Sequence, residues 1–118
     1  MRGIRGAITV KENSKKAIYE AAQRLMEEII KKNEIYAEDI GVIIFSMTED
    51  LTAAFPTAGI REIPGFDVVP LFDVRQLAIE NSLKKCIRVL LLVDTNKSQR
   101  DIRHVYLDGA KILRPDLI

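Results

Sequence analysis

Residues 86–93 read CIRVLLLV, and Arg88 is the one charged side chain in this segment. A strand with a solvent-exposed face alternates apolar and polar residues, whereas a near-continuous apolar strand indicates that both faces of its sheet are covered. A buried guanidinium without partners is costly, so Arg88 must be paired or must face a polar cavity. Taken alone, an arginine at the strand end that pairs with an acidic residue is an equally good interpretation. The segment predicts a strand with a cation on a covered face.

One long amphipathic helix is expected to cover one face of this sheet. From residue 14 to residue 32, apolar residues recur every four positions and form one stripe, after the suitable N-cap residues Asn13 and Ser14. A single long helix covers only one face. We therefore expect the other face to contact another subunit.

The remaining elements do not follow strict βαβ alternation, so the predicted class is α+β with a mixed sheet. The pattern predicts strands at 1–10, 40–47, 67–72, 86–95, 104–107 and 111–113, a short helix at 56–62, and one helical turn at 98–101. The segment 73–85 is expected to be a loop that can hold a helical turn. No repeat or linker divides the chain, and residues 1–118 are expected to form one domain.

Composition argues against several classes of protein. Lys and Arg number 18 against 17 Asp and Glu, and the net charge of +1 gives no electrostatic basis for binding nucleic acid or a membrane surface. Cys86 is the only cysteine and His104 the only histidine, which argues against a disulfide, a metal cluster and a Ser-His-Asp mechanism. No apolar run is long enough for a signal peptide or a membrane span, so a cytoplasmic protein is expected.

Four further residues are candidates for binding an anion. Arg5 lies between Gly3 and Gly6, where missing side chains let a ligand or another backbone approach closely. Arg61, Tyr106 and Arg114 have ordinary explanations as solvated arginines and a core tyrosine. No single one of these residues identifies a function.

Five sequence blocks taken together resemble the trimeric chorismate mutases. The blocks are RGIRGA at 2–7, TEDLTAAFP at 48–56, LKKCIRV at 83–89, RHVYL at 103–107 and LRPDL at 113–117. Each is weak alone, but they occur in the family's order with compatible spacing over essentially the whole chain. The resemblance implies a homotrimer resembling a pseudo α/β barrel, with active sites between subunits. It also implies an isomerase that converts chorismate to prephenate for phenylalanine and tyrosine biosynthesis, by a non-covalent pericyclic rearrangement without metal or cofactor.

The resemblance also implies roles for individual residues. Arg88 is the expected catalytic cation, which donates to the ether oxygen of the dianionic substrate and to a neighbouring carboxylate, while Arg5 and Tyr106 bind carboxylate oxygens. The adjacent subunit is expected to supply a second group. That group consists of Phe55, Thr57, Ala58 and Arg61. Leu113 and Arg114 are expected to close over the pocket as a mobile C-terminal segment.

The segment 72–76 departs from the family pattern. It supplies catalytic candidates Asp73 and Gln76 and substrate-binding candidates Phe72, Val74 and Arg75. The family commonly has a glutamate where this chain has Gln76 and a small neutral residue where it has Asp73. We hypothesise that the carboxylate has moved to Asp73, since residues three apart are neighbours on a helical turn. The alternative is that Asp73 is a solvated acid and Gln76 alone suffices.

A second departure affects charge, because Ala58 stands where some relatives have a lysine. Arg75 is the candidate for replacing that cation. Two other functions compete with the mutase: a trimeric enamine/imine deaminase of similar architecture that also uses interface arginines, and a metabolite-binding trimer without catalysis. An assay that compares turnover of chorismate with turnover of an imine distinguishes the mutase from the deaminase. Binding without conversion identifies the metabolite-binding trimer.

Overall fold

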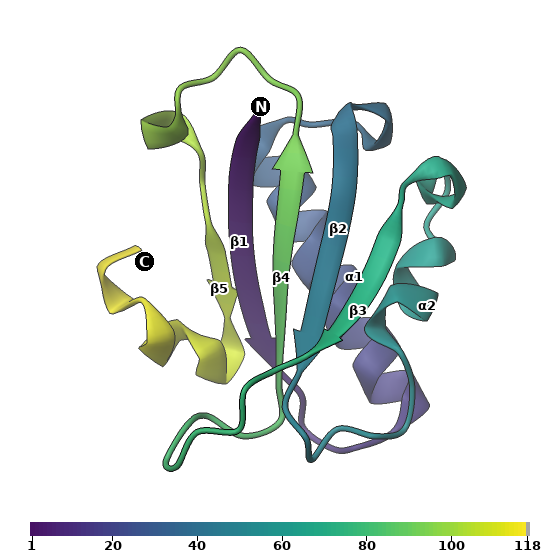
Figure 1. Ribbon diagram of the computed structural model, residues 1–118, viewed down its shortest axis with the longest axis vertical. Coiled ribbons are helices and arrows are strands. Elements are labelled where there is room, and N and C mark those ends of the chain that lie inside the picture. Colours follow the sequence, from purple (N-terminus) through teal and green to yellow (C-terminus); the bar gives the residue numbers. More distant parts are fainter. Residues whose placement is uncertain (118) are drawn as a thin grey trace.

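Five strands form one mixed sheet in the computed structural model, which describes residues 1–117 (Figure 1). They are β1 (Arg2–Thr9), β2 (Ile40–Met47), β3 (Leu71–Arg75), β4 (Cys86–Val93) and β5 (Val105–Leu107). Their order across the sheet is β3-β2-β4-β1-β5. β4 is central and antiparallel to β1 and β2, whereas the edge strands β3 and β5 pair in parallel with β2 and β1. The predicted α+β class with a mixed sheet is confirmed.

The long helix α1 (Lys15–Asn33) covers one face of the sheet, as predicted (Figure 1). Its start is set by Ser14, whose Oγ accepts a hydrogen bond from the backbone N–H of Ala17 at 3.2 Å. Its end is set by Glu34 in the left-handed conformation. A short helix, α2 (Pro56–Arg61), packs beside it. Within residues 1–117, no helix has the length and apolar character needed to cross a membrane.

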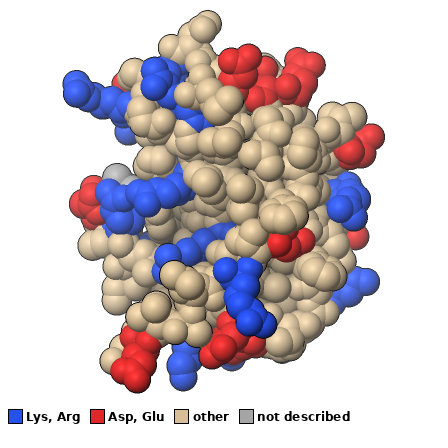
Figure 2. All heavy atoms as spheres, viewed as in Figure 1, with Lys and Arg blue, Asp and Glu red and all other residues tan. Residues whose placement is uncertain are grey.

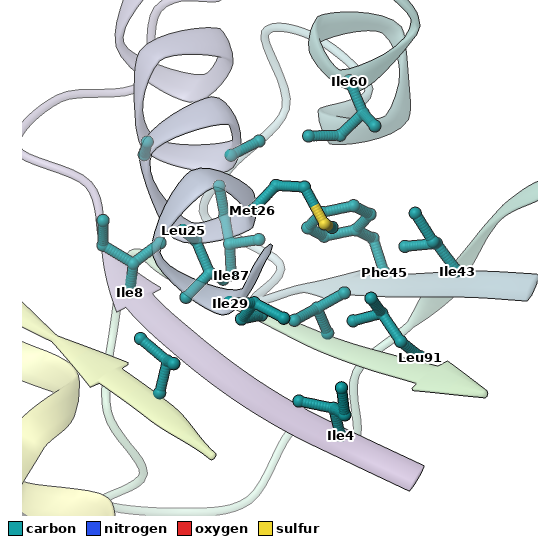
Figure 3. Close-up of a cluster of buried hydrophobic side chains, with 14 of the residues drawn as sticks. Ile4, Ile8, Leu25, Met26, Ile29, Ile43, Phe45, Ile60, Ile87 and Leu91 are labelled. Carbon is teal, nitrogen blue, oxygen red and sulfur yellow. The ribbon is translucent and has the colours of Figure 1, made fainter. Parts of the chain in front are cut away.

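The main core lies between these helices and the sheet. Figure 3 shows Met26 of α1 and Ile60 of α2 directed toward the ring of Phe45 on β2. Alternate residues of the strands supply the sheet side of this core, namely Ile4, Ile8, Ile43, Ile87 and Leu91, all with no exposed surface. Each such side chain contributes about 1.5–3 kcal/mol by its removal from water.

Gly6 is required by the packing of this core. A Cβ at this position would lie 2.9 Å from the carbonyl oxygen of Val105 and 3.0 Å from Cδ1 of Ile29. The missing side chain thus allows β5 and α1 to approach β1 from two directions.

The other face of the sheet, which we call the open face, carries the alternate strand residues. It presents Arg5 and Ala7 on β1, Ser46 on β2, Phe72 and Val74 on β3, and Arg88 and Leu90 on β4. The helix η4 (Asp108–Leu113) covers only part of it, where Ala110 packs with Ala7 and Cys86. Phe72 stays 61% exposed and Leu90 38% exposed. Within one subunit, the expected cover of both faces is therefore incomplete.

Two predicted strands are wrong. In place of a strand at 67–72, Phe66–Val68 forms a 3₁₀ turn and β3 begins at Leu71. Pro70 has no N–H to donate, and the ladder to β2 begins with its carbonyl, which accepts from Ile43 at 3.0 Å. In place of a strand at 111–113, η4 follows a turn at Asp108, whose φ is 52°. The remaining predicted strands and helices are present, with ends shifted by at most two residues. Ile118, the last residue of the predicted domain, lies outside the described residues.

Candidate active site

A cavity of about 210 Å³, which we call the anion pocket, lies on the open face. Its lining is Arg5, Gly6, Arg88, Val89, Tyr106, Leu113 and Arg114. Five of these seven residues are predicted site residues from three separate parts of the chain. Figure 2 shows Lys and Arg side chains gathered around a hollow on the left of this face.

Strand register brings the pocket residues together. Ala7 on β1 pairs with Arg88 on β4 on one side and with Tyr106 on β5 on the other. Directly paired residues project from the same face of a sheet, so Arg88 and Tyr106 flank the small side chain of Ala7. Arg5 lies two residues earlier on β1 and shares that face.

The charges in the pocket are mainly unneutralised. Within residues 1–117, no salt bridge joins Arg5 or Arg88 to an acidic side chain, so Arg88 is not the strand-end arginine of an ion pair. Arg114 differs, because its Nη2 and Nε donate to the carboxylate of Asp116 at 2.9 and 3.1 Å. That hydrogen bonding raises the pKa of Arg114 above its ordinary value. Two available guanidiniums and a phenol hydroxyl suit a ligand with two carboxylates.

His104 supports the pocket by binding the backbone of Arg5, a role that the sequence did not reveal. Its Nδ1 accepts a hydrogen bond from the backbone N–H of Arg5 at 2.9 Å. Burial, together with the charges of Arg5 and Arg114, lowers the pKa of His104 below its ordinary value. The ring is therefore neutral at pH 7 and can keep Nδ1 as an acceptor. The side-chain amide of Gln99 bonds in a similar way to the backbone N–H and carbonyl of Gly3. These two side chains therefore bind the backbone of β1 at Gly3 and Arg5, where β5 does not pair with it.

Cys86 lies next to the pocket but is a core residue. Its side chain is buried with Ala7 and Ala110, and burial raises the pKa of the Cys86 thiol. A thiol that stays protonated is a poor nucleophile.

The second predicted group lies apart from the anion pocket. Phe55 and Thr57, with Ala58 and Arg61, are on or next to α2, on the helix side of the edge strand β3. Thr57 Oγ1 donates to Asp73 Oδ2 at 2.6 Å. Asp73 Oδ1 is buried and has no hydrogen-bond partner within the described chain. An unsatisfied buried carboxylate oxygen is costly and calls for an explanation.

The loop predicted from Asp73 begins later, because Leu71–Arg75 is a strand, and the helical turn on which the Asp73 hypothesis depended is not formed at 73–75. Asp73 pairs with the core residue Phe45 and faces α2, whereas Val74 pairs with Ser46 on the open face. Gln76 follows the strand and accepts from Ser46 Oγ at 3.4 Å. Within one subunit, Asp73 therefore cannot share the position of Gln76, and it lies on the opposite side of the sheet from Arg88. Arg75 is exposed at the end of β3 and does not line the anion pocket.

Comparison with known proteins identifies the family. The model of the family "Chorismate mutase type I" matches residues 1–117. The chain belongs to the type I chorismate mutases. The predicted family is therefore confirmed, and with it the isomerase activity and the role in aromatic biosynthesis.

Individual relatives agree with this family over nearly their full length. Chorismate mutase AroH of Bacillus subtilis (strain 168) is 42% identical over 117 residues, which cover 99% of this chain and 92% of that protein. Chorismate mutase AroH of Thermus thermophilus is 46% identical over 118 residues, covering 99% and 96%. A solved chorismate mutase from Clostridium thermocellum superposes with a TM-score of 0.91 at 43% identity, covering 93% of this chain and 97% of that one. These matches favour the mutase over the enamine/imine deaminase.

Proposed function

We propose that this chain converts chorismate to prephenate in the anion pocket, by a pericyclic rearrangement within the phenylalanine and tyrosine pathway. The observation that carries the proposal is the meeting of Arg5, Arg88 and Tyr106 in one cavity, with neither arginine neutralised within residues 1–117. The reaction needs no nucleophile or proton transfer. It needs a dianion held in a compact conformation, which lowers the entropic part of the barrier.

Each pocket residue has one proposed role. Arg88 donates to the ether oxygen, where negative charge develops as the bond breaks, and to a nearby carboxylate. Arg5 and Tyr106 hold carboxylate oxygens through directed hydrogen bonds. Leu113 and Arg114 form the side of the pocket supplied by the C-terminal segment, which we call the C-terminal wall. A cytoplasmic location and a single domain over residues 1–118 stay predictions.

The assay that tests this function follows the loss of chorismate absorbance with purified protein and identifies the product. Formation of prephenate supports the proposal. Binding of prephenate without turnover would instead support a metabolite-binding protein. Turnover of an amino-acid-derived imine and not of chorismate would support a deaminase. Absence of chorismate and prephenate binding would contradict the anion pocket itself.

We further propose that the protein is a homotrimer with sites between subunits. Phe72 on the open face is 61% exposed, and Leu77 and Ile79 in the loop after β3 are 79% and 63% exposed, which is more apolar surface than an isolated subunit is expected to keep in water. A neighbouring subunit can cover this face and bring its Phe55 and Thr57, with Ala58 and Arg61, against the anion pocket. Light scattering is expected to give three times the subunit mass. A stable active monomer would contradict the shared site.

Two variants test which residue takes the role of the glutamate that the family commonly has at the position of Gln76. We propose that Asp73, held by the hydroxyl of Thr57, acts across the subunit interface beside the second predicted group, whereas Gln76 acts from the open face. Asp73→Asn is expected to lower kcat/KM roughly tenfold to a hundredfold, the range for hydrogen bonds to charged groups. Asparagine can still accept from Thr57. Gln76→Ala is expected to have a smaller effect.

The control for this comparison is Asp67→Asn, which removes an exposed carboxylate before β3. Steady-state kinetics with chorismate measure all three variants. If Asp73→Asn is as active as Asp67→Asn while Gln76→Ala is impaired, Asp73 has no catalytic role and Gln76 alone suffices.

A further inference from the structure

The turn formed by Asp108 and Gly109 connects β5 to the segment that carries the C-terminal wall. In Figure 1 the yellow C-terminal segment turns at the lower end of β5 and runs back beside that strand. Asp108 has a φ of 52°, a conformation that a residue with a side chain seldom adopts without other contacts. The turn is therefore a point where the surrounding structure must hold the backbone in place.

Two contacts hold this turn, and they come from different layers of the fold. From α1, Arg24 Nη1 and Nη2 bind Asp108 Oδ2 and Oδ1 at 2.7 and 2.9 Å. From β1, Thr9 Oγ1 accepts the backbone N–H of Gly109 at 2.9 Å. A Cβ at position 109 would lie 2.9 Å from the same Thr9 oxygen, so the backbone approaches β1 closely.

The segment after the turn reaches the anion pocket directly. η4 begins at Asp108, buries Ala110 against Ala7 and Cys86, and ends at Leu113. Leu113 and Arg114 then line the pocket with Arg5 and Arg88. Because the segment is short, a shift or rotation of the turn is transmitted to Arg114.

The Arg24–Asp108 pair is better suited to setting a position than to stabilising the whole fold. Both side chains are largely exposed, at 56% and 40%, and exposed ion pairs contribute little to global stability. The two parallel bonds nevertheless fix the orientation of the carboxylate. The hydrogen bond from Arg24 lowers the pKa of Asp108, so the pair is charged at neutral pH.

We propose that Arg24 and Asp108 are positioning residues for the reaction. Their ion pair, together with the Thr9–Gly109 hydrogen bond, holds the C-terminal wall where it closes the pocket over the substrate. This inference rests on the proposed chorismate mutase function. Neither residue lines the pocket, so both act through Leu113 and Arg114.

The test measures kinetics for Arg24→Gln, Asp108→Asn, the double variant and the exchanged pair Arg24→Asp with Asp108→Arg. Each single variant is expected to raise KM for chorismate about fivefold, with a smaller change in kcat, a loss comparable to that of one exposed ion pair. The double variant is expected to be no worse than a single one, because both changes break the same interaction. The exchanged pair is expected to recover only part of the affinity, because arginine fits the positive φ of position 108 less well than aspartate.

The matched control is Lys16→Gln, which removes the exposed Lys16–Glu20 pair of the same helix. Urea unfolding midpoints of all variants are expected to stay close to that of the unaltered protein. A parallel fall in kcat, affinity and unfolding midpoint would assign the pair a structural role and overturn the inference, as would an unchanged KM. Failure of the unaltered protein to convert chorismate would overturn the proposed function as well, so the two failures are distinguishable.

Discussion

Arg88→Ala is expected to lower kcat for chorismate by at least about 100-fold to 1000-fold, the usual cost of losing one preorganised donor at a developing negative charge. Arg88 projects from the central strand into the anion pocket, and the register places it beside Ala7 and Ser46. Both neighbours are small and uncharged, so neither can replace the lost cation.

Two further variants show whether charge or geometry matters more. Arg88→Lys keeps the charge but loses the planar pair of donors, and its kcat is expected to lie between those of the alanine variant and the unaltered protein. Arg100→Ala removes an exposed arginine outside the pocket and is expected to leave kcat unchanged. Near-normal turnover by Arg88→Ala would remove Arg88 from the mechanism.

Phe45→Ala is expected to lower the free energy of unfolding by about 3–5 kcal/mol, the range for a buried aromatic residue replaced by alanine. Phe45 is among the largest side chains with no exposed surface, and it packs between β2 and the helices (Figure 3). Its removal leaves a cavity that Met26 and Ile60 can fill only in part.

Tyr36→Ala is the matched control, because this aromatic side chain is 72% exposed. It is expected to change the free energy of unfolding by no more than about 0.5 kcal/mol. Urea unfolding of both variants is compared at one protein concentration, since association of subunits adds to apparent stability. A loss below about 1 kcal/mol for Phe45→Ala would mean that the core collapses around the missing ring.

The elements that the sequence predicted well are those with a strong local pattern. α1 and the strands β2 and β4 have regular apolar periodicity, and their bounds differ from the predicted ones by at most two residues. The strand predicted at 111–113 failed because the turn at Asp108 and Gly109, which precedes these residues, starts the 3₁₀ helix η4. That turn depends on Arg24 and Thr9, which are distant in sequence.

The sequence predicted the residues of the anion pocket better than it predicted the position of Asp73. Arg5, Arg88 and Tyr106 were identified through family resemblance, and they meet because β1 lies between β4 and β5. Strand order of this kind is not encoded in local pattern. The geometry proposed for Asp73 failed because residues three apart are neighbours on a helix but face opposite sides of a strand. His104 was missed because its contact is with the backbone N–H of Arg5. Almost every residue has a backbone N–H, so such a contact leaves no signal in the sequence.

The strand order also has a consequence for synthesis of the chain. β1 and β2 are made first, but they are not neighbours in the sheet; β4 joins them. A nascent chain that has not yet emerged from the ribosome as far as residue 93 holds β1 without either of its partner strands. Its apolar residues can then be shielded only by α1 or by other macromolecules, because long-range strand pairing must wait. The sheet and the anion pocket therefore form together, after most of the polypeptide has been translated.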